Sequence, residues 1–208
     1  MIRGLKTRGF TRIIVVDDGS SDPTGMLAYQ EGAMVLRHLL NRGIGGALGT
    51  GIKAALLYNP EIIVTFDVDG QHDPDDIPRL LEPIEKGEAD VVNGSRMLNP
   101  AGMPWSRWLA NLIANFVPYI LFGVRTSDSQ SGLRAFSREA AAQIRIMTSG
   151  MEVGSEILAE SAERHLKYAE VPVKAIYTDY SLSKGQSITV GLYTLMKLVL
   201  AKVRRFTL

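Results

Sequence analysis

The sequence predicts an α/β fold, an open and mostly parallel sheet with helices on both faces. Strand and helix patterns alternate along the first half of the chain, and the connections between them are short. Polar residues directly follow the strand patterns, and in sheets of this kind ligands bind beyond the carboxyl ends of the strands. With 208 residues, the chain is long enough for one domain with a sizeable core.

Each element of the first half has its own signal. Residues 2–8 resemble the end of a helix closed by Gly9, and residues 11–17 form a β-branched run typical of a buried strand. Asp22 and Pro23 are a strong helix start, because they combine a capping oxygen with a fixed φ. The same reasoning predicts, in order, a helix from 22 to about 31, a strand over 33–37, a helix from the glycine-rich residues 41–51 to about 58, a strand from 62, a helix over 73–87 and a strand over 90–95.

The second half has a different character. It begins with a long aromatic and aliphatic helix pattern over residues 105–124. The longest apolar stretch within it, residues 108–124, is interrupted by Asn111, Asn115 and Pro118 and is too short and too broken for a membrane span. The expected elements that follow are a polar loop over 127–136, a helix from Ser137 to about 147, a helix over 152–166, an edge strand with Pro172 over 169–177, a polar loop over 179–187 and an amphipathic helix over 188–206.

Composition excludes several classes of function. The net charge of +1 gives no electrostatic reason to expect a nucleic-acid partner. The chain has no cysteine, which excludes disulfides, thiolate zinc sites and a cysteine nucleophile. The basic N-terminal residues lack an apolar segment, so we expect no signal peptide.

The residues 62–72, I-I-V-T-F-D-V-D-G-Q-H, are the clearest candidate site. An apolar strand pattern ends in Asp67 and Asp69, and Gln71 follows them. Oxygen ligands of this type favour Mg²⁺ or Mn²⁺ over zinc, and such a cation can hold a diphosphate. A solvated turn is the alternative. We expect His72 to be a neighbour of the site rather than a ligand.

Two other segments leave alternatives open. Asp17 and Asp18 end the first strand pattern, where a carboxylate either binds a base edge or ribose or is a simple part of the turn before the next helix. Residues 41–51, N-R-G-I-G-G-A-L-G-T-G, fit neither common phosphate-loop pattern. Gly46 and Gly49 allow either close helix-to-sheet packing or close approach of backbone to a diphosphate.

Basic and amphipathic features have two interpretations each. Arg96, Arg107 and Arg134 each lie in uncharged surroundings, and together they could supply planar donors to phosphate oxygens. Singly, each is an ordinary surface residue. The helix patterns over 105–124 and 188–206 fit either core packing or a membrane interface.

Taken in series, the motifs resemble the polyprenyl-phosphate glycosyltransferases, inverting GT-A enzymes of family 2 similar to dolichol-phosphate mannose synthase. The resemblance covers essentially the whole chain. It rests on a set of motifs in a fixed order: D-D-G-S-S-D, N-R-G-I-G-G-A, D-V-D-G-Q, G-S-R, D-S-Q-S-G-L-R-A-F and a late S-K.

The resemblance implies a GT-A domain over residues 1–187 and an amphipathic C-terminal helix over 188–208. It implies transfer of a sugar from a nucleotide-sugar donor of the GDP-mannose or UDP-glucose type to a polyprenyl or dolichyl phosphate. The implied roles are metal and diphosphate binding by Asp67, Asp69 and Gln71, nucleotide and sugar binding by Asp17 and Asp18, acceptor phosphate binding by Arg96 and Arg107, lining of the donor or acceptor site by Gln130, Ser131 and Arg134, and closure over the diphosphate by Lys184.

The expected chemistry is simple. A phosphate monoester has a second pKa of about 6, so it is already a nucleophile at neutral pH and needs no general base. The metal, Mg²⁺ or Mn²⁺, would stabilise the leaving diphosphate, and arginines would align the acceptor for in-line attack with inversion. Asp69, Arg96 and Arg107 are therefore the expected catalytic residues. We expect a peripheral protein on the cytoplasmic face of the membrane, and an exposed sheet edge or lipid-facing helices could make it a homo-oligomer.

The sequence departs from the family pattern in two places. The family begins with a strand ending in a motif like P-A-Y-N-E, which has no counterpart ahead of residue 2. The family often has an arginine before the late S-K, where this chain has Y-T-D-Y over 177–180. The alternatives are a non-catalytic or inactive sugar-nucleotide binding protein and a sugar nucleotidyltransferase.

Overall fold

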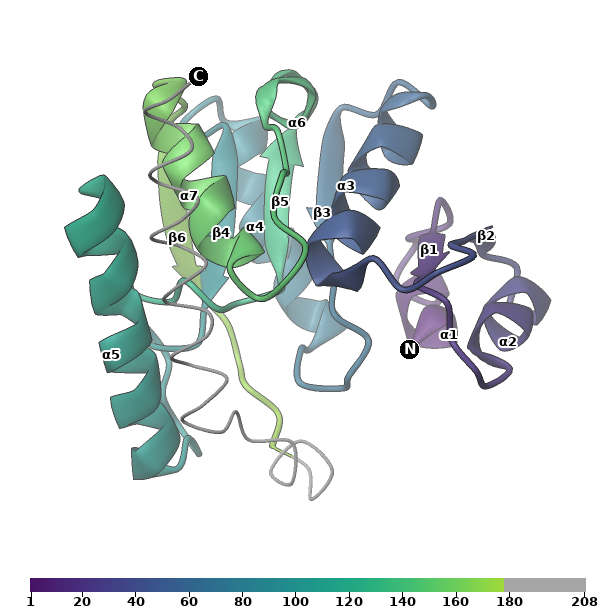
Figure 1. Cartoon of the computed structure of the whole chain (residues 1–208), viewed down its shortest axis with the longest axis horizontal. Helices are drawn as coiled ribbons and strands as arrows, with labels where there is room; N and C mark the ends of the chain where they lie inside the picture. The colour runs from purple at the N-terminus through teal and green to yellow at the C-terminus, as the bar shows by residue number, and fades with distance from the viewer. Residues whose placement is uncertain (178–208) are drawn as a thin grey trace.

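The computed structural model describes residues 1–177, apart from the side chains at positions 117, 121 and 122. The expected closing residue Lys184, the loop over 179–187 and the helix over 188–206 lie outside the described residues. The described part has the expected α/β architecture, with helices on both faces of its larger sheet (Figure 1).

The strands form two sheets. The smaller sheet pairs β1 (Ile14–Asp17) with β2 (Met34–Arg37) in parallel. The larger sheet has the order β3-β5-β4-β6, in which β4 and β6 are parallel and β5 runs antiparallel between β3 and β4. The bounds of its strands are Ile62–Thr65 for β3, Val91–Ser95 for β4, Arg134–Ser137 for β5 and Tyr168–Pro172 for β6.

Two apolar clusters lie on opposite faces of the larger sheet. One joins its strands to α3, α6 and α7 through residues such as Ile52, Phe136 and Ile157. The other joins them to α4 through Leu80, and Leu5 of α1 packs against it. The helices are α1 (Ile2–Lys6), α2 (Thr24–Gln30), α3 (Gly43–Leu56), the 3-10 turn η1 (Pro74–Asp76), α4 (Ile77–Glu85), α5 (Trp105–Phe122), α6 (Arg138–Gln143) and α7 (Val153–Glu163).

Strand β5 was not expected from the sequence. Its residues fall at the end of the segment predicted as a polar loop over 127–136, yet all of them are buried in the middle of the sheet. The segment lacks a β-branched run, so the usual strand signal is missing. Pairing with β3 on one side and β4 on the other supplies the hydrogen bonds that make it a strand.

The glycine-rich residues at the start of α3 pack against another part of the chain. A Cβ on Gly43 or Gly45 would lie only 2.1 or 2.0 Å from the backbone oxygen of Ser149 or Thr148, and the Gly45 amide donates to the Ser149 oxygen. The close-packing interpretation is therefore supported, but for different glycines: Gly49 has ordinary space around it. A Cβ on Gly46 would contact only the side chain of Arg42.

Candidate functional site

The antiparallel direction of β5 assembles the site. Because β5 runs against β3 and β4, its first residue lies beside their carboxyl ends: Arg134 pairs with Thr65 on one side and with Asn93 on the other. The residues just before β5 are thereby placed next to the acidic turn that follows β3. The motifs D-V-D-G-Q and S-Q-S-G-L-R, separated by about 60 residues in the sequence, meet here.

A small pocket of about 30 Å³ marks this meeting point. Asp67, Gln130, Ser131 and Arg134 provide its polar lining, so four of the residues expected to bind the donor or the metal lie together. Its apolar wall comes from the first turns of α3 and from the start of α7, through Ile44, Leu48, Met151 and Val153.

Asp67 lies in a confined position between Asp69 and two arginines. Burial raises the pKa of the Asp67 carboxyl, and the charge of Asp69 raises it further, while Arg134 and Arg96 act in the opposite direction. Gly132 is required beside it, since a Cβ there would lie 1.8 Å from Asp67 Oδ2.

The other two expected metal ligands form a turn. The carboxylate of exposed Asp69 accepts a hydrogen bond from the backbone N–H of Gln71 at 2.9 Å. In the described part of the chain, no group of three or more histidine, aspartate or glutamate side chains could hold a metal by itself. Mg²⁺ is usually bound by one or two carboxylates with substrate phosphates completing the shell, so a donor set of Asp67 and Asp69 fits a metal that arrives with a diphosphate.

Arg134 is buried and holds the segment before it in place. Its Nε donates to Asn93 Oδ1 at 3.0 Å, and its Nη2 donates to the Ser129 backbone oxygen at 2.9 Å. Burial lowers the pKa of Arg134, although the charges of Asp128 and Asp67 oppose this. Ser131 is also buried, and its hydroxyl accepts from the Leu133 amide at 3.3 Å. Both residues shape the pocket from within.

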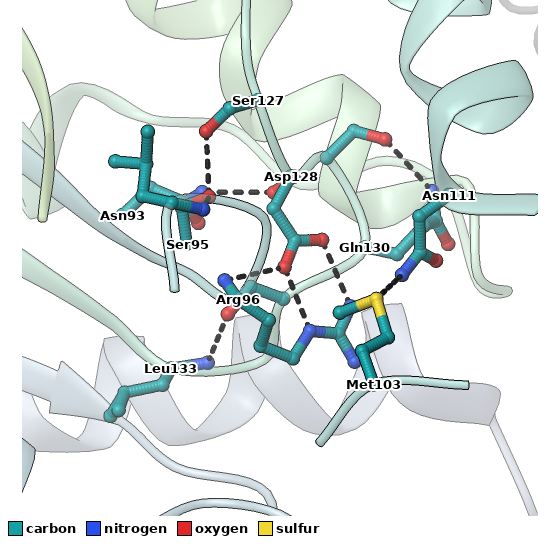
Figure 2. Close-up of polar contacts among 12 residues, drawn as sticks. Asn93, Ser95, Arg96, Met103, Asn111, Ser127, Asp128, Gln130 and Leu133 are labelled. Carbon is teal, nitrogen blue, oxygen red and sulfur yellow. Dashed lines mark hydrogen bonds and ion pairs between the residues drawn. The ribbon is translucent and has the colours of Figure 1, made fainter. Parts of the chain in front are cut away.

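Arg96 does not point freely into solvent. Its Nε and Nη2 donate to the two carboxylate oxygens of Asp128 at 2.7 and 2.9 Å, and its backbone amide donates to the same carboxylate at 3.0 Å (Figure 2). Burial opposes the charge of Arg96, but the hydrogen bonds and charge of Asp128 outweigh it and raise the Arg96 pKa. Asp128 is fully buried.

Arg107 lies in the first turn of α5 and acts on the same group as Arg96. Burial raises the pKa of the Tyr177 phenol, and the positive charges of Arg96 and Arg107 both oppose that rise. The two arginines expected at the acceptor phosphate thus lie within electrostatic reach of one phenol.

Asp17 and Asp18 have partners of their own. The Asp17 carboxylate accepts from the Ser20 amide at 2.8 Å. Asp18 Oδ1 lies 2.5 Å from His38 Nδ1 and accepts from the Arg42 amide at 2.9 Å. Asp18 therefore holds Arg42, the residue before α3, and neither carboxylate is among the residues that line the pocket beside Asp67. Their expected contact with the nucleotide stays a prediction.

Several residues that hold the site together were missed by sequence reasoning. Glu170 on β6 is the centre of one group: it accepts from Thr126, from the Ser127 amide and hydroxyl, and from Tyr168. The buried Asn115 of α5 accepts from Ser129 at 2.8 Å. No local pattern marks these residues, because their partners are remote in sequence. Asp128 at least belongs to a quoted motif, D-S-Q-S-G-L-R-A-F.

Helix α5 has an exposed apolar face. Its outward residues include Trp105, Ile113, Phe116 and Ile120, which are 77, 62, 60 and 63% exposed. The helix stands at one side of the molecule, beyond β6 (Figure 1). No helix among the described residues is long and apolar enough to span a bilayer.

Known proteins share this fold. The glucosyl-3-phosphoglycerate synthase of Mycobacterium tuberculosis, solved in complex with Mn²⁺ and uridine-diphosphate-glucose, superposes with a TM-score of 0.64. The match covers 91% of this chain and 67% of the synthase chain, and the sequences are 22% identical. The fold is therefore the GT-A fold of nucleotide-sugar glycosyltransferases, which confirms the expected fold class.

The particular family follows from sequence comparison. The model of glycosyl transferase family 2 matches residues 2–145. An uncharacterized protein of Methanocaldococcus jannaschii is 46% identical over 97% of this chain and 85% of its own length. The UDP-N-acetylglucosamine–dolichyl-phosphate N-acetylglucosaminyltransferase of Methanococcus voltae is 34% identical over 98% of this chain and 90% of its own length. The chain belongs to glycosyl transferase family 2.

Proposed function

We propose that this glycosyltransferase moves a hexosyl group from a nucleotide-sugar to a polyprenyl phosphate, with a divalent cation at Asp67 and Asp69. The observation that carries the proposal is the order of features across the site. The acidic turn follows β3, Arg96 follows β4 further along the same sheet, and Arg107 and the exposed apolar face belong to α5, which stands beyond β6 (Figure 1). This order suits a metal-bound diphosphate, an acceptor phosphate and a lipid chain.

The donor side is assigned to the pocket beside Asp67. Asp67 and Asp69, with Gln71 beside them, would hold Mg²⁺ or Mn²⁺, and when bound the cation supplies stabilisation of the leaving diphosphate. The fold neighbour crystallised with Mn²⁺ and uridine-diphosphate-glucose supports a cation of this type. Gln130 lines the pocket with Asp67, which supports a role for it in donor binding.

The acceptor side is assigned to Arg96, Arg107 and α5. A phosphate monoester with a second pKa of about 6 is mostly dianionic at neutral pH, so the arginines need only bind and align it. A single in-line displacement inverts the anomeric carbon. The relative from Methanococcus voltae, whose name gives dolichyl phosphate as acceptor, supports a lipid phosphate here.

The apolar face of α5 would bring the site to the lipid. An amphipathic helix in the plane of the interface buries its apolar face among the headgroups and the upper acyl chains. Peripheral attachment to the cytoplasmic face of the membrane is part of this proposal. A matched test replaces Phe116 and Ile120 with serine; the double variant should float less with anionic liposomes than the wild type.

Transfer itself is the main test. The chain would be incubated with UDP-N-acetylglucosamine, UDP-glucose or GDP-mannose, a polyprenyl phosphate and Mn²⁺, and the lipid product measured. We expect transfer from one donor, loss of it with EDTA, and a fall of at least about a hundredfold in kcat for Asp69→Asn, because a direct metal ligand is removed. The surface variant Asp75→Asn is the matched control.

Three outcomes would contradict the proposal. Metal-dependent nucleotide binding without transfer from any donor would indicate a non-catalytic sugar-nucleotide binding protein. Formation of a nucleotide-sugar from a sugar phosphate and a nucleoside triphosphate would indicate a nucleotidyltransferase. A covalent glycosyl-enzyme during turnover would overturn the inverting displacement.

A further inference from the structure

The segment 126–131, which links α5 to β5, is fixed from three sides. Glu170 on β6 accepts hydrogen bonds from Thr126 Oγ1 at 2.7 Å and from the Ser127 amide and hydroxyl at 2.9 and 2.8 Å. Asn93 on β4 donates to the Asp128 backbone oxygen at 2.9 Å. Asn115 on α5 binds Ser129. The position of Asp128 is therefore set by β4, β6 and α5 together.

Glu170 is well suited to hold this segment. Burial works against its charge, but the hydrogen bonds from Thr126, Ser127 and Tyr168 outweigh that effect and lower the pKa of the Glu170 carboxyl. Tyr168 remains a neutral donor, since burial raises the pKa of its phenol. A carboxylate with several donors around it cannot be replaced by an amide without placing donor against donor.

Asp128 in turn leaves one end of Arg96 available. A guanidinium has five N–H donors, and the Asp128 carboxylate engages only the Nε and one Nη2 hydrogen. Within residues 1–177 no hydrogen bond is made by the Nη1 end, and planar N–H pairs of this kind match phosphate oxygens. We call the two parallel hydrogen bonds from Arg96 to the Asp128 carboxylate the fork. The side chain of Arg96 is 12% exposed and that of Asp128 is 0% exposed, so the fork holds the arginine from the buried side.

We propose that Asp128 is a positioning residue for the transfer reaction: it orients Arg96 so that the free end of the guanidinium meets the phosphate of the lipid acceptor. Glu170 supports it by fixing residues 126–128. The inference rests on the proposed function, because it takes the ligand of Arg96 to be the acceptor phosphate. A long arginine side chain loses conformational entropy when it binds a ligand. Because the fork already fixes Arg96 before the phosphate binds, less entropy is lost on binding.

The test compares Asp128→Asn, Glu170→Gln and Arg96→Ala in steady-state transfer. It uses farnesyl phosphate as a soluble acceptor and the donor that the wild type accepts. In Asp128→Asn an amide hydrogen faces an Arg96 donor, so the fork is lost. We expect the acceptor KM to rise about tenfold or more, which equals the loss of roughly 1.4 kcal/mol of binding, while the donor KM stays within about twofold.

The double variant Asp128→Asn with Arg96→Ala distinguishes positioning from a general structural role. If Asp128 acts through Arg96, adding Asp128→Asn to the Arg96→Ala variant should not change its acceptor KM any further. Glu170→Gln should raise the acceptor KM in the same direction and by less. Asp75→Asn is the matched surface control, and thermal unfolding of each variant confirms that it is folded.

The outcomes separate this inference from the proposed function. An unchanged acceptor KM in Asp128→Asn would overturn it, as would equal rises in donor and acceptor KM, or additive effects in the double variant. If Asp128→Asn does not fold, an unchanged acceptor KM in Glu170→Gln is by itself enough to overturn the inference. If the wild type neither binds farnesyl phosphate in calorimetry nor transfers sugar to it, the proposed function fails first and this inference falls with it.

Discussion

The two sheets differ in a way that runs against their sequences. Strand β1 belongs to the β-branched run T-R-I-I-V-V-D, which predicts a strand buried on both faces, yet its apolar residues are only partly buried. Strand β5 has the unpromising sequence R-A-F-S, and every residue in it is buried. The comparison teaches that a strand's burial depends on its neighbours more than on its own composition.

The neighbours explain the difference. Strand β5 has a partner on each side and helices over both faces. Strand β1 pairs with β2 alone, and within the described residues no pairing joins it to β3. Helix α3 connects the two regions, because it packs on β1 and also supplies Ile52 to the core of the larger sheet. We therefore call the start of α3 the junction between the two sheets, because disrupting its packing would weaken the contact between them.

The largest effect is expected at that junction. Gly45→Ala would place a methyl group 2.0 Å from the Thr148 oxygen, which is backbone and cannot turn aside. We expect the free energy of unfolding to fall by about 3 kcal/mol, at the upper end of the cost of overpacking. Gly49→Ala, one turn along the same helix, meets only Ile146 at 3.7 Å and should stabilise by roughly 0.5–1 kcal/mol. Urea denaturation measures both, and equal effects would contradict the packing at this junction.

The second prediction concerns acid stability of the larger sheet. His72 follows β3, its side chain is buried, and its Nδ1 has no hydrogen-bond partner among the described residues. Burial lowers the pKa of His72 to about 4. In the unfolded chain His72 takes up its proton near pH 6.5. Between pH 6.5 and 4 the unfolded state therefore binds more protons than the folded state, so falling pH favours unfolding. The free energy of unfolding at pH 4 should be about 3 kcal/mol lower than above pH 6.5 because of this residue.

Replacing His72 tests this assignment. His72→Leu should remove that part of the acid dependence, which appears as a shallower fall in unfolding free energy from pH 7 to pH 4 than in the wild type. The carboxylates titrate in both proteins and cancel in the difference. His165→Asn is the control, since His165 is exposed and asparagine tolerates its φ of 55°. Parallel pH curves for wild type and His72→Leu would contradict the prediction.

The smallest effect compares the two sheets directly. Val92 of β4 is fully buried, and Val16 of β1 is partly exposed. Val92→Ala should cost roughly 2–3 kcal/mol, because it leaves a cavity in a packed core, whereas Val16→Ala should cost about 1 kcal/mol. Denaturant unfolding gives both values. If the two substitutions cost the same, β1 is as well covered in solution as β4, and the contrast between the sheets is wrong.

The sequence by itself determined the α/β class, the acidic turn with Asp67 and Asp69, and the family. Those features are local: alternating strand and helix patterns, the Ser137 cap at the start of α6, and motifs a few residues long. The cap expected at Asp22 is not formed, since α2 begins after Pro23 without a side-chain cap. The helix starts and most strand positions follow for the same reason, since residues close in the chain decide them. Even Pro172 correctly marked β6 as an edge strand.

Tertiary structure decided which residues of the motifs lie next to one another. The antiparallel placement of β5 brought Arg134 and Gln130 beside Asp67, and the fork of Asp128 on Arg96 joins groups 32 residues apart in the sequence. Asp18 contacts His38 and the backbone N–H of Arg42 before α3, and it does not line the pocket. Such pairings are settled by which strands become neighbours and which charges must be compensated once buried, and neither is encoded in any short stretch of the chain.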